Sequence, residues 1–165
     1  MIREFNGKLP QIDPTAFVSE AAYIIGDVTI GPYSSVWPGA IIRADQGPIS
    51  IGSHTNIQDN SVVHTDVAAK IGNHVTVGHR VVCHAASIDD YSLLGNGCVV
   101  NEGASIGRNV IVASASMVLE QKHIPEGTLA AGIPAVIKGK LFRRHKELIS
   151  AVSEHYVRLA QQYKV

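Results

Sequence analysis

Histidine is the residue type in this chain best suited to chemistry, because neutral imidazole nitrogens bind zinc and other transition metals. The 165 residues include eight histidines and two cysteines. Cys83 and Cys98 lack the CxxC spacing of a redox or zinc pair, so any metal would be held through nitrogen. The candidate metal ligands are His64, His79 and His84.

The other histidines and both cysteines are interpreted as structural. A lone surface histidine is usually only solvated, and five histidines are read in this way: His54, His74, His123, His145 and His155. Cys83 and Cys98 fall at regularly spaced apolar or small positions, so we expect buried packing residues rather than catalytic thiols. The three candidate ligands are far apart in the chain, so the fold must bring them together.

Aliphatic residues recur every six positions, with short slips of phase between blocks. The series is Ile12, Val18, Ile24, Ile30, Val36, Ile42, Ile51, Ile57, Val63, Ile71, Val77, Cys83, Ile88, Leu94, Val100, Ile106, Val112 and Val118. A helix needs a period of about 3.6 and a lone strand a period of two. A period of six predicts short strands joined by sharp corners, three to a coil, in a triangular parallel β-helix of about six coils with about 18 residues each.

The residues around each corner are expected to be small. A small residue, which lets the chain bend, stands four places after most of the aliphatic residues: Ala16, Ala22, Val28, Ser34, Ala40, Thr55, Ser61, Val75, Val81, Ser92, Cys98, Ala104, Val110 and Ser116. Glycine often follows the aliphatic residue directly, as at Gly31, Gly52, Gly72, Gly78, Gly95 and Gly107. We interpret these glycines as marking backbone geometry that other residues resist.

The register of the coils places the candidate ligands on the surface of the prism. His64 and His84 each follow the third aliphatic residue of successive coils, so they stack on one face, one layer apart, and point outward. Arg43 lies in the same column one layer below. His79 lies near the corner between the second and third faces, and Asp59 takes the corresponding place one layer lower.

This placement leads to the hypothesis of a homotrimer. Two imidazoles about 5 Å apart can share a metal ion, whose ligand nitrogens are about 3.4 Å apart in a tetrahedral site. A third nitrogen from a corner of the same chain would have to wrap around the edge, so another subunit supplies it more easily. Three prisms around a threefold axis would form three sites, each with His64 and His84 from one chain and His79 from the next.

The repeat stops after Val118, and the period then changes to that of a helix. Breakers in residues 130–139 close the prism. An apolar stripe follows: Leu141, His145, Leu148, Ile149, Val152, Tyr156, Leu159, Ala160 and Tyr163. We predict one domain over residues 1–165, an all-β solenoid with its β-helix at 12–137 and a C-terminal α-helix at 141–163 packed along its side.

Charge and hydropathy exclude several classes of function. Fourteen Lys and Arg balance fourteen Asp and Glu, so no long-range field attracts nucleic acid or an anionic membrane. No stretch approaches the about 18 apolar residues that cross a bilayer. We therefore expect a cytoplasmic protein that binds neither nucleic acid nor membrane.

A joint motif resembles the gamma-class carbonic anhydrases. It consists of Arg43-Ala44-Asp45, Asn56-Ile57-Gln58-Asp59, and the three histidines His64, His79 and His84, in that order. The resemblance implies a left-handed β-helix, a homotrimer, and metal sites between subunits at those histidines. It implies Zn²⁺, with Fe²⁺ or Co²⁺ as alternatives. The implied reaction is reversible hydration of carbon dioxide to bicarbonate by a metal-bound hydroxide.

The resemblance also implies roles for five further residues. Arg43, Asp45 and Asp59 look like an intersubunit ion-pair set, although the sequence alone equally allows a solvated charge group. Gln58 looks like the residue that orients hydroxide and carbon dioxide, and its alternative is an ordinary polar surface side chain. Tyr156 is similar to a helix tyrosine found near the site in short relatives, and its alternative is packing within the apolar stripe.

Two departures from the family pattern predict low activity. Gln46 stands where an acidic residue follows the Arg-x-Asp motif, and only residues 65–70 separate His64 from Ile71, where the family has a long acidic loop with a proton-shuttling glutamate. A glutamine cannot carry a proton away at neutral pH. Hydration is therefore expected to be slow, dependent on buffer, or absent.

Two other functions remain open. A hexapeptide acyltransferase or an acyl-coenzyme A thioesterase would share the prism and its closure, but would need only one histidine as general base. A non-catalytic assembly subunit would use a docking surface such as the basic cluster Lys138, Lys140, Arg143, Arg144 and Lys146. The alternative interpretation of that cluster is a solvated start of the helix.

Overall fold

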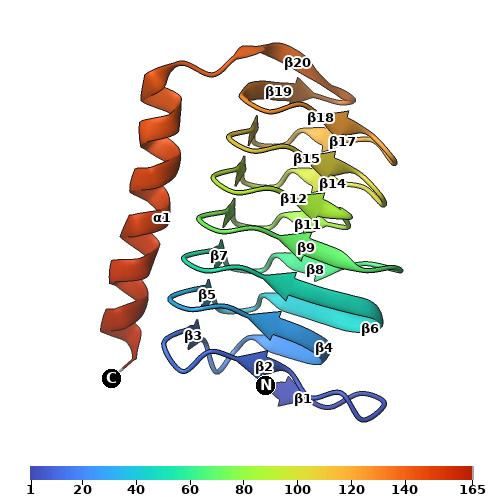
Figure 1. Cartoon of the computed structure of the whole chain (residues 1–165), viewed down its shortest axis with the longest axis vertical. Helices are drawn as coiled ribbons and strands as arrows, with labels where there is room; N and C mark the ends of the chain where they lie inside the picture. The colour runs from blue at the N-terminus through green and yellow to red at the C-terminus, as the bar shows by residue number, and fades with distance from the viewer. Residues whose placement is uncertain (165) are drawn as a thin grey trace.

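A computed structural model describes residues 1–164 and shows the expected left-handed parallel β-helix with a single C-terminal helix. Six complete coils are stacked along one axis, and a seventh begins at β18 and ends in the hairpin of β19 and β20 (Figure 1). Each coil contributes one short strand to each of three faces. The chain therefore forms a triangular prism, as the period of six predicted.

Parallel pairing between successive coils builds the faces. The first face contains β2 (Gln11–Ile12), the second halves of β4 (Tyr23–Ile30) and β6 (Ile41–Ile51), β9 (Ala69–Ile71), β12 (Ser87–Ile88), β15 (Ser105–Ile106) and β18 (His123–Ile124). The second contains β3 (Phe17–Val18), β5 (Ser35–Val36), β7 (Asn56–Ile57), β10 (Thr76–Val77), β13 (Leu93–Leu94), β16 (Ile111–Val112), β19 (Thr128–Gly132) and the antiparallel β20 (Ala135–Lys140). The third contains β1 (Ile2–Arg3), the first halves of β4 and β6, β8 (Val62–His64), β11 (Val82–Cys83), β14 (Val99–Val100) and β17 (Met117–Val118).

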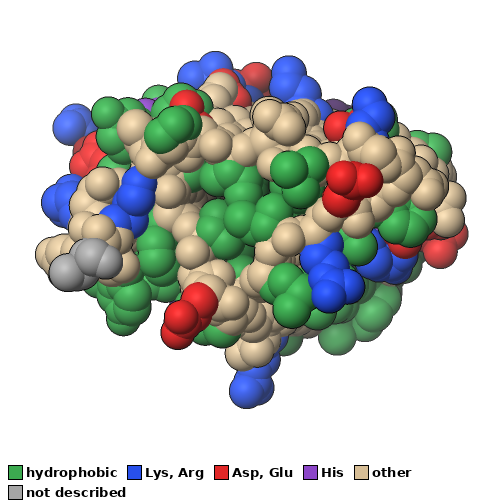
Figure 2. All heavy atoms as spheres, turned by 90° about the horizontal axis from the view of Figure 1, so that it is seen from below, with side chains coloured by type: hydrophobic (Ala, Val, Ile, Leu, Met, Phe, Trp, Pro, Cys, Tyr) green, Lys and Arg blue, Asp and Glu red, His purple; other side chains and the backbone are tan. Residues whose placement is uncertain are grey.

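The aliphatic series fills the interior of the prism. From Ile24 to Val118 every member is 3% exposed or less. Ile12 and Val18 are only partly buried, because they belong to the first coil and have no coil beneath them. Seen from that end, apolar side chains occupy the centre of the molecule's surface (Figure 2). Burying one such side chain contributes about 1.5–3 kcal/mol to the free energy of folding. The repeat therefore supplies much of the hydrophobic stabilisation of the prism.

The glycines at the corners are needed for a reason that differs from the expected one. Gly52 has no left-handed backbone, but a Cβ at this position would lie 2.7 Å from the carbonyl group of Gly72 in the next coil. Left-handed φ values occur instead at Tyr33, His54 and His74, with φ of 56°, 56° and 55°. The glycines that follow the aliphatic residues therefore permit the close approach of neighbouring coils, while bulkier residues and other glycines adopt the left-handed backbone of the turns.

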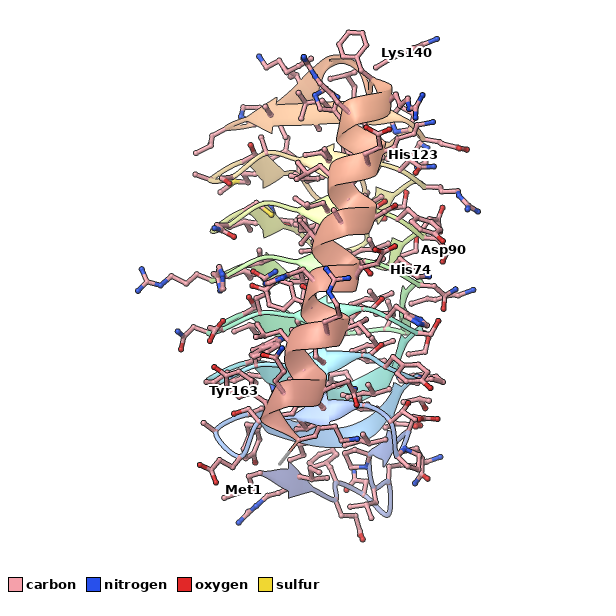
Figure 3. The ribbon with its side chains drawn as sticks, turned by 90° about the vertical axis from the view of Figure 1, so that its left-hand side faces the viewer. Met1, His74, Asp90, His123, Lys140 and Tyr163 are labelled. Carbon is pink, nitrogen blue, oxygen red and sulfur yellow. The ribbon has the colours of Figure 1, made fainter. Side chains whose placement is uncertain are left out.

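Helix α1 (Arg143–Tyr163) runs along the second face, where it contacts β3, β5, β7 and β10 (Figure 3). Ile149 and Ala160 are fully buried against the prism, and Ala160 packs on Phe17 and Trp37. Leu148, expected in the buried stripe, is 51% exposed, because the stripe is narrower than the sequence pattern indicates. Within residues 1–164 no helix is long and apolar enough to span a membrane.

Candidate metal centre

His64 and His84 meet on the third face, as the register predicted. His64 ends β8, and His84 follows β11, which pairs with β8 so that Cys83 lies opposite Val63. The His64 Nδ1 and His84 Nε2 atoms are 3.0 Å apart, and the two ring centroids are 5.0 Å apart. The two side chains are only 13% and 24% exposed. One chain thus presents two imidazole nitrogens close enough to bind one metal ion.

Asp45 fixes the orientation and tautomer of His64. His64 Nε2 lies 3.0 Å from Asp45 Oδ1, and Arg43 donates a hydrogen bond to the other carboxylate oxygen. Burial alone would raise the pKa of Asp45, but the hydrogen bonds from Arg43 and His64 outweigh it and lower the pKa. An ionised carboxylate only accepts, so the proton of His64 stays on Nε2 and the lone pair on Nδ1 points toward His84. This donor set fits Zn²⁺.

A carboxylate that the sequence did not predict lies beside the two histidines. Asp66 belongs to the short segment between β8 and β9, and its Oδ1 is 3.9 Å from His84 Nε2. His64, Asp66 and His84 each offer one atom that can bind a metal, and these three atoms lie within 4.8 Å of one another. Within residues 1–164, no other three His, Cys, Asp or Glu side chains are grouped closely enough to hold an ion.

His79 lies apart from the other two histidines, at the corner between the second and third faces. It follows β10, and its Nδ1 is 2.9 Å from Asp59 Oδ2. Its side chain is 44% exposed. A single chain therefore does not unite the three candidate ligands. The sequence places His79 at the same corner, and the sharing of His79 with a neighbouring subunit stays a prediction.

Gln58 is not an ordinary surface residue, because it is only 4% exposed. Its Nε2 donates to Asn56 Oδ1 at 2.9 Å, and Asn56 Nδ2 donates in turn to Thr76 Oγ1 at 3.0 Å. These two hydrogen bonds fix which way the amide of Gln58 points. Asn56 belonged to the motif on which the resemblance rests, but its contact with Thr76 has no signal in the sequence.

Tyr156 connects the helix to the corner that carries His79. Its ring packs edge-on against Trp37, with centroids 5.3 Å apart. Partial burial, and then the negative charge of Asp59, raise the pKa of Tyr156. Tyr156, Gln58 and His79 line one hollow of about 280 Å³ between the helix and the prism. The hydroxyl is therefore held protonated at neutral pH, where it can act as a donor.

The expected site residues thus form two separate half-sites. The first half-site, on the third face, comprises Arg43, Asp45, His64 and His84, with Asp66 added by the structure. The second half-site, at the corner, comprises Gln58, Asp59, His79 and Tyr156. Each half-site lacks what the other has: the first has an adjacent pair of imidazoles, and the second has a further imidazole with hydrogen-bonding groups beside it.

The fold places the chain among the hexapeptide-repeat proteins. A solved structure titled hexapeptide transferase family protein, from Anaplasma phagocytophilum, has a TM-score of 0.95 and 34% sequence identity, and the alignment covers 98% of this chain and 97% of that one. No family model matches the chain.

Curated relatives define the family more narrowly. The chain is 37% identical over 166 residues to the carbonic anhydrase of Geobacillus kaustophilus, covering 99% of this chain and 91% of the relative. It is 39% identical over 162 residues to gamma carbonic anhydrase 2, mitochondrial, of Arabidopsis thaliana, covering 93% of this chain and 58% of that protein. The chain thus spans about three fifths of the length of the plant relatives it matches. It belongs to the gamma carbonic anhydrase family.

Proposed function

We propose that the protein catalyses the reversible hydration of carbon dioxide to bicarbonate at metal sites shared between the subunits of a homotrimer. The observation that carries this proposal is the pair of imidazole nitrogens 3.0 Å apart, one of them oriented by Asp45, in a chain of this family. His64 and His84 of one protomer and His79 of the next would hold the ion. The first half-site of one chain would then face the second half-site of its neighbour.

The ion is proposed to be Zn²⁺, with Fe²⁺ or Co²⁺ as alternatives. When bound by neutral histidines, Zn²⁺ lowers the pKa of a bound water from about 16 to about 7, which makes hydroxide available near neutral pH. Asp45 keeps the lone pair of His64 on Nδ1 for the ion. Arg43, which is 45% exposed in one chain, is proposed to pair with Asp59 of the neighbouring protomer as well as with its own Asp45.

The second half-site is proposed to orient carbon dioxide. Gln58 Nε2 donates one of its two N–H groups to Asn56, which fixes the orientation of the amide, and its carbonyl oxygen can accept a hydrogen bond from the attacking oxygen. The protonated hydroxyl of Tyr156 can donate to an oxygen of bicarbonate in the same hollow. Contacts within the protein hold both side chains before substrate enters. Binding of carbon dioxide therefore loses little conformational entropy of these side chains.

The fate of the proton sets the expected rate. Gln46 replaces the acidic residue of the family pattern, and the segment 65–70 is too short to hold the acidic loop. Buffer molecules are therefore proposed to take the proton from the site, and activity should be low in dilute buffer. The cytoplasmic location stays a prediction, since the matching plant proteins carry a mitochondrial name.

The test combines metal content with hydration rate. We expect about one metal ion per chain after native purification, and a carbon dioxide hydration rate that rises with buffer concentration. His84→Ala should lose both the metal and the rate, because it removes one of two adjacent ligands. His123→Ala, which changes an exposed histidine on β18, is the matched control and should behave like the wild type. Hydration that survives His84→Ala would contradict the proposal.

Acyl transfer is the second candidate, and the observation that favours it is the close structural match titled hexapeptide transferase family protein. This function predicts tight binding of acetyl-coenzyme A by protein that contains no metal. The same purified samples can be titrated with acetyl-coenzyme A. Binding that is unaffected by a chelator and by His84→Ala would favour the transferase over the anhydrase.

A further inference from the structure

Strand β20 (Ala135–Lys140) leaves one backbone edge free at the upper end of the prism. It is the terminal strand of the second sheet, and within residues 1–164 it pairs only with β19 (Figure 1). Ala135 is buried, while the five residues that follow it are exposed. The pairing with β19 is regular from Ala135 to Ile137 and shifts register at Lys138. A short row of backbone N–H and C=O groups is therefore open to a further strand.

Apolar side chains lie beside this edge and are not covered. Val136 and Ile137 of β20 are exposed. Phe142, which lies between β20 and the helix, is exposed as well. Together with Arg143 and Arg144 it lines a hollow of about 460 Å³. The hollow has room for an apolar side chain of a bound molecule.

The same end of the molecule is strongly basic. Its five exposed basic side chains are Lys138, Lys140, Arg143, Arg144 and Lys146. In the part of the chain that the structure describes, Arg143 alone among them forms an ion pair, with Glu147. Lys140 lies at this end, beside the start of the helix (Figure 3). Two copies of β20 would repel each other along this edge, whereas an acidic strand would be attracted.

An acidic peptide suits this surface better than an anionic membrane. Both could neutralise the positive charge and cover the apolar side chains. Hydrocarbon, however, cannot pair the free N–H and C=O groups of a sheet edge, and burying such groups unpaired is costly. An added strand pairs these groups with its own backbone and removes that cost.

We propose that the free edge of β20 binds an extended acidic segment of a partner protein as an additional strand. The backbone of the segment pairs with residues 135–137, and its carboxylates face Lys138 and Lys140. One of its apolar side chains enters the hollow beside Phe142. This surface shares no residue with either half-site, so docking leaves the proposed metal site free.

The test measures binding of a labelled peptide, acetyl-Glu-Val-Glu-Val-Asp-Phe-Asp-amide, by fluorescence anisotropy. The full chain should bind this peptide, and salt should weaken the binding. Lys140→Glu should weaken it at least about fivefold, because the change replaces an attraction by a repulsion. Lys70→Glu makes the same change at an exposed lysine on β9, on the first face, and is the matched control. It should bind the peptide like the wild type.

A second peptide separates strand addition from attraction between charges. It has the same sequence with methylated backbone nitrogens at alternate residues, so it keeps every carboxylate but cannot form the strand ladder. The chain should bind it at least about tenfold more weakly. Equal binding of the two peptides would overturn the proposal.

Three other outcomes would also overturn it. The first is equal peptide binding by the wild type and Lys140→Glu, or no binding up to about 1 mM peptide. The second is binding to vesicles that contain phosphatidylserine but not to the peptide, with the vesicle binding lost in Lys140→Glu, which would assign the surface to a membrane. The third is a smaller native mass of Lys140→Glu than of the wild type, which would assign the edge to a second copy of the chain.

Discussion

At the scale of single residues, His54 and His74 are not solvated surface histidines. They belong to a column of stacked aromatic rings at the corner between the first and second faces. His74 stacks on His54 with ring centroids 4.7 Å apart and on Tyr91 at 4.6 Å. The helix covers this column, and Ser153 Oγ lies 3.3 Å from His74 Nδ1 (Figure 3). Within residues 1–164 the buried His54 Nδ1 has no hydrogen-bond partner. Expecting both histidines to be merely solvated was therefore too simple.

This column predicts that stability falls in mild acid. Burial, and then the nearby His54, lower the pKa of His74, while Asp90 and Glu154 oppose them. The unfolded chain, with an ordinary histidine pKa of about 6.5, then binds more protons than the folded chain as the pH falls below that value. The free energy of unfolding should therefore decrease from pH 7.5 to 5.

His74→Phe keeps a ring in the stack but removes the titration. Denaturant unfolding of the metal-free proteins at several pH values compares the two chains. The variant should lose less stability than the wild type over this range. The same slope in both chains would show that His74 does not contribute.

At the scale of elements, the helix depends on a few buried side chains. Ile149 is fully buried against the prism, whereas its neighbour Leu148 is 51% exposed. Ile149→Ala should therefore lower the free energy of unfolding by about 2–5 kcal/mol. Leu148→Ala removes a side chain of the same volume from the same turn and should change it by less than about 0.5 kcal/mol. Chemical denaturation measures both, and similar losses would mean that the helix does not dock through Ile149.

The elements also show what the sequence could and could not predict. Positions of the six-residue repeat such as Ile57 and Leu94 are fully buried. The strict repeat makes every such side chain point into the interior of the prism. The same register predicted the spacing of His64 and His84. Asp66 escaped prediction because it lies in a segment outside the repeat, where position depends on tertiary contacts such as the close approach of the Val67 carbonyl oxygen to Gly47. Periodicity likewise could not tell whether a glycine is needed for a left-handed backbone conformation or for the close approach of the next coil.

At the scale of the whole molecule, the proposed metal site needs a second chain, because one chain holds its two half-sites apart. The ligand atoms that one chain groups together exclude His79, which instead pairs with Asp59 at the corner. In the proposed homotrimer, each first half-site would lie against the second half-site of a neighbour, as cyclic symmetry repeats one interface three times. The proposed activity is then a property of the assembly, and damage to one half-site can be complemented by another chain.

Mixing two defective chains tests this complementation. His64→Ala damages the first half-site and His79→Ala the second, so neither variant alone should retain metal through a chelator wash or hydrate carbon dioxide. A mixed ring has one interface where an intact first half-site meets an intact second one. If the two variants are refolded together in equal amounts and assemble at random, about a quarter of the wild-type number of sites should be intact. Mixing His64→Ala with His84→Ala, which damage the same half-site, should restore none. Mixed trimers that recover no metal, or equal recovery in both mixtures, would rule out sharing.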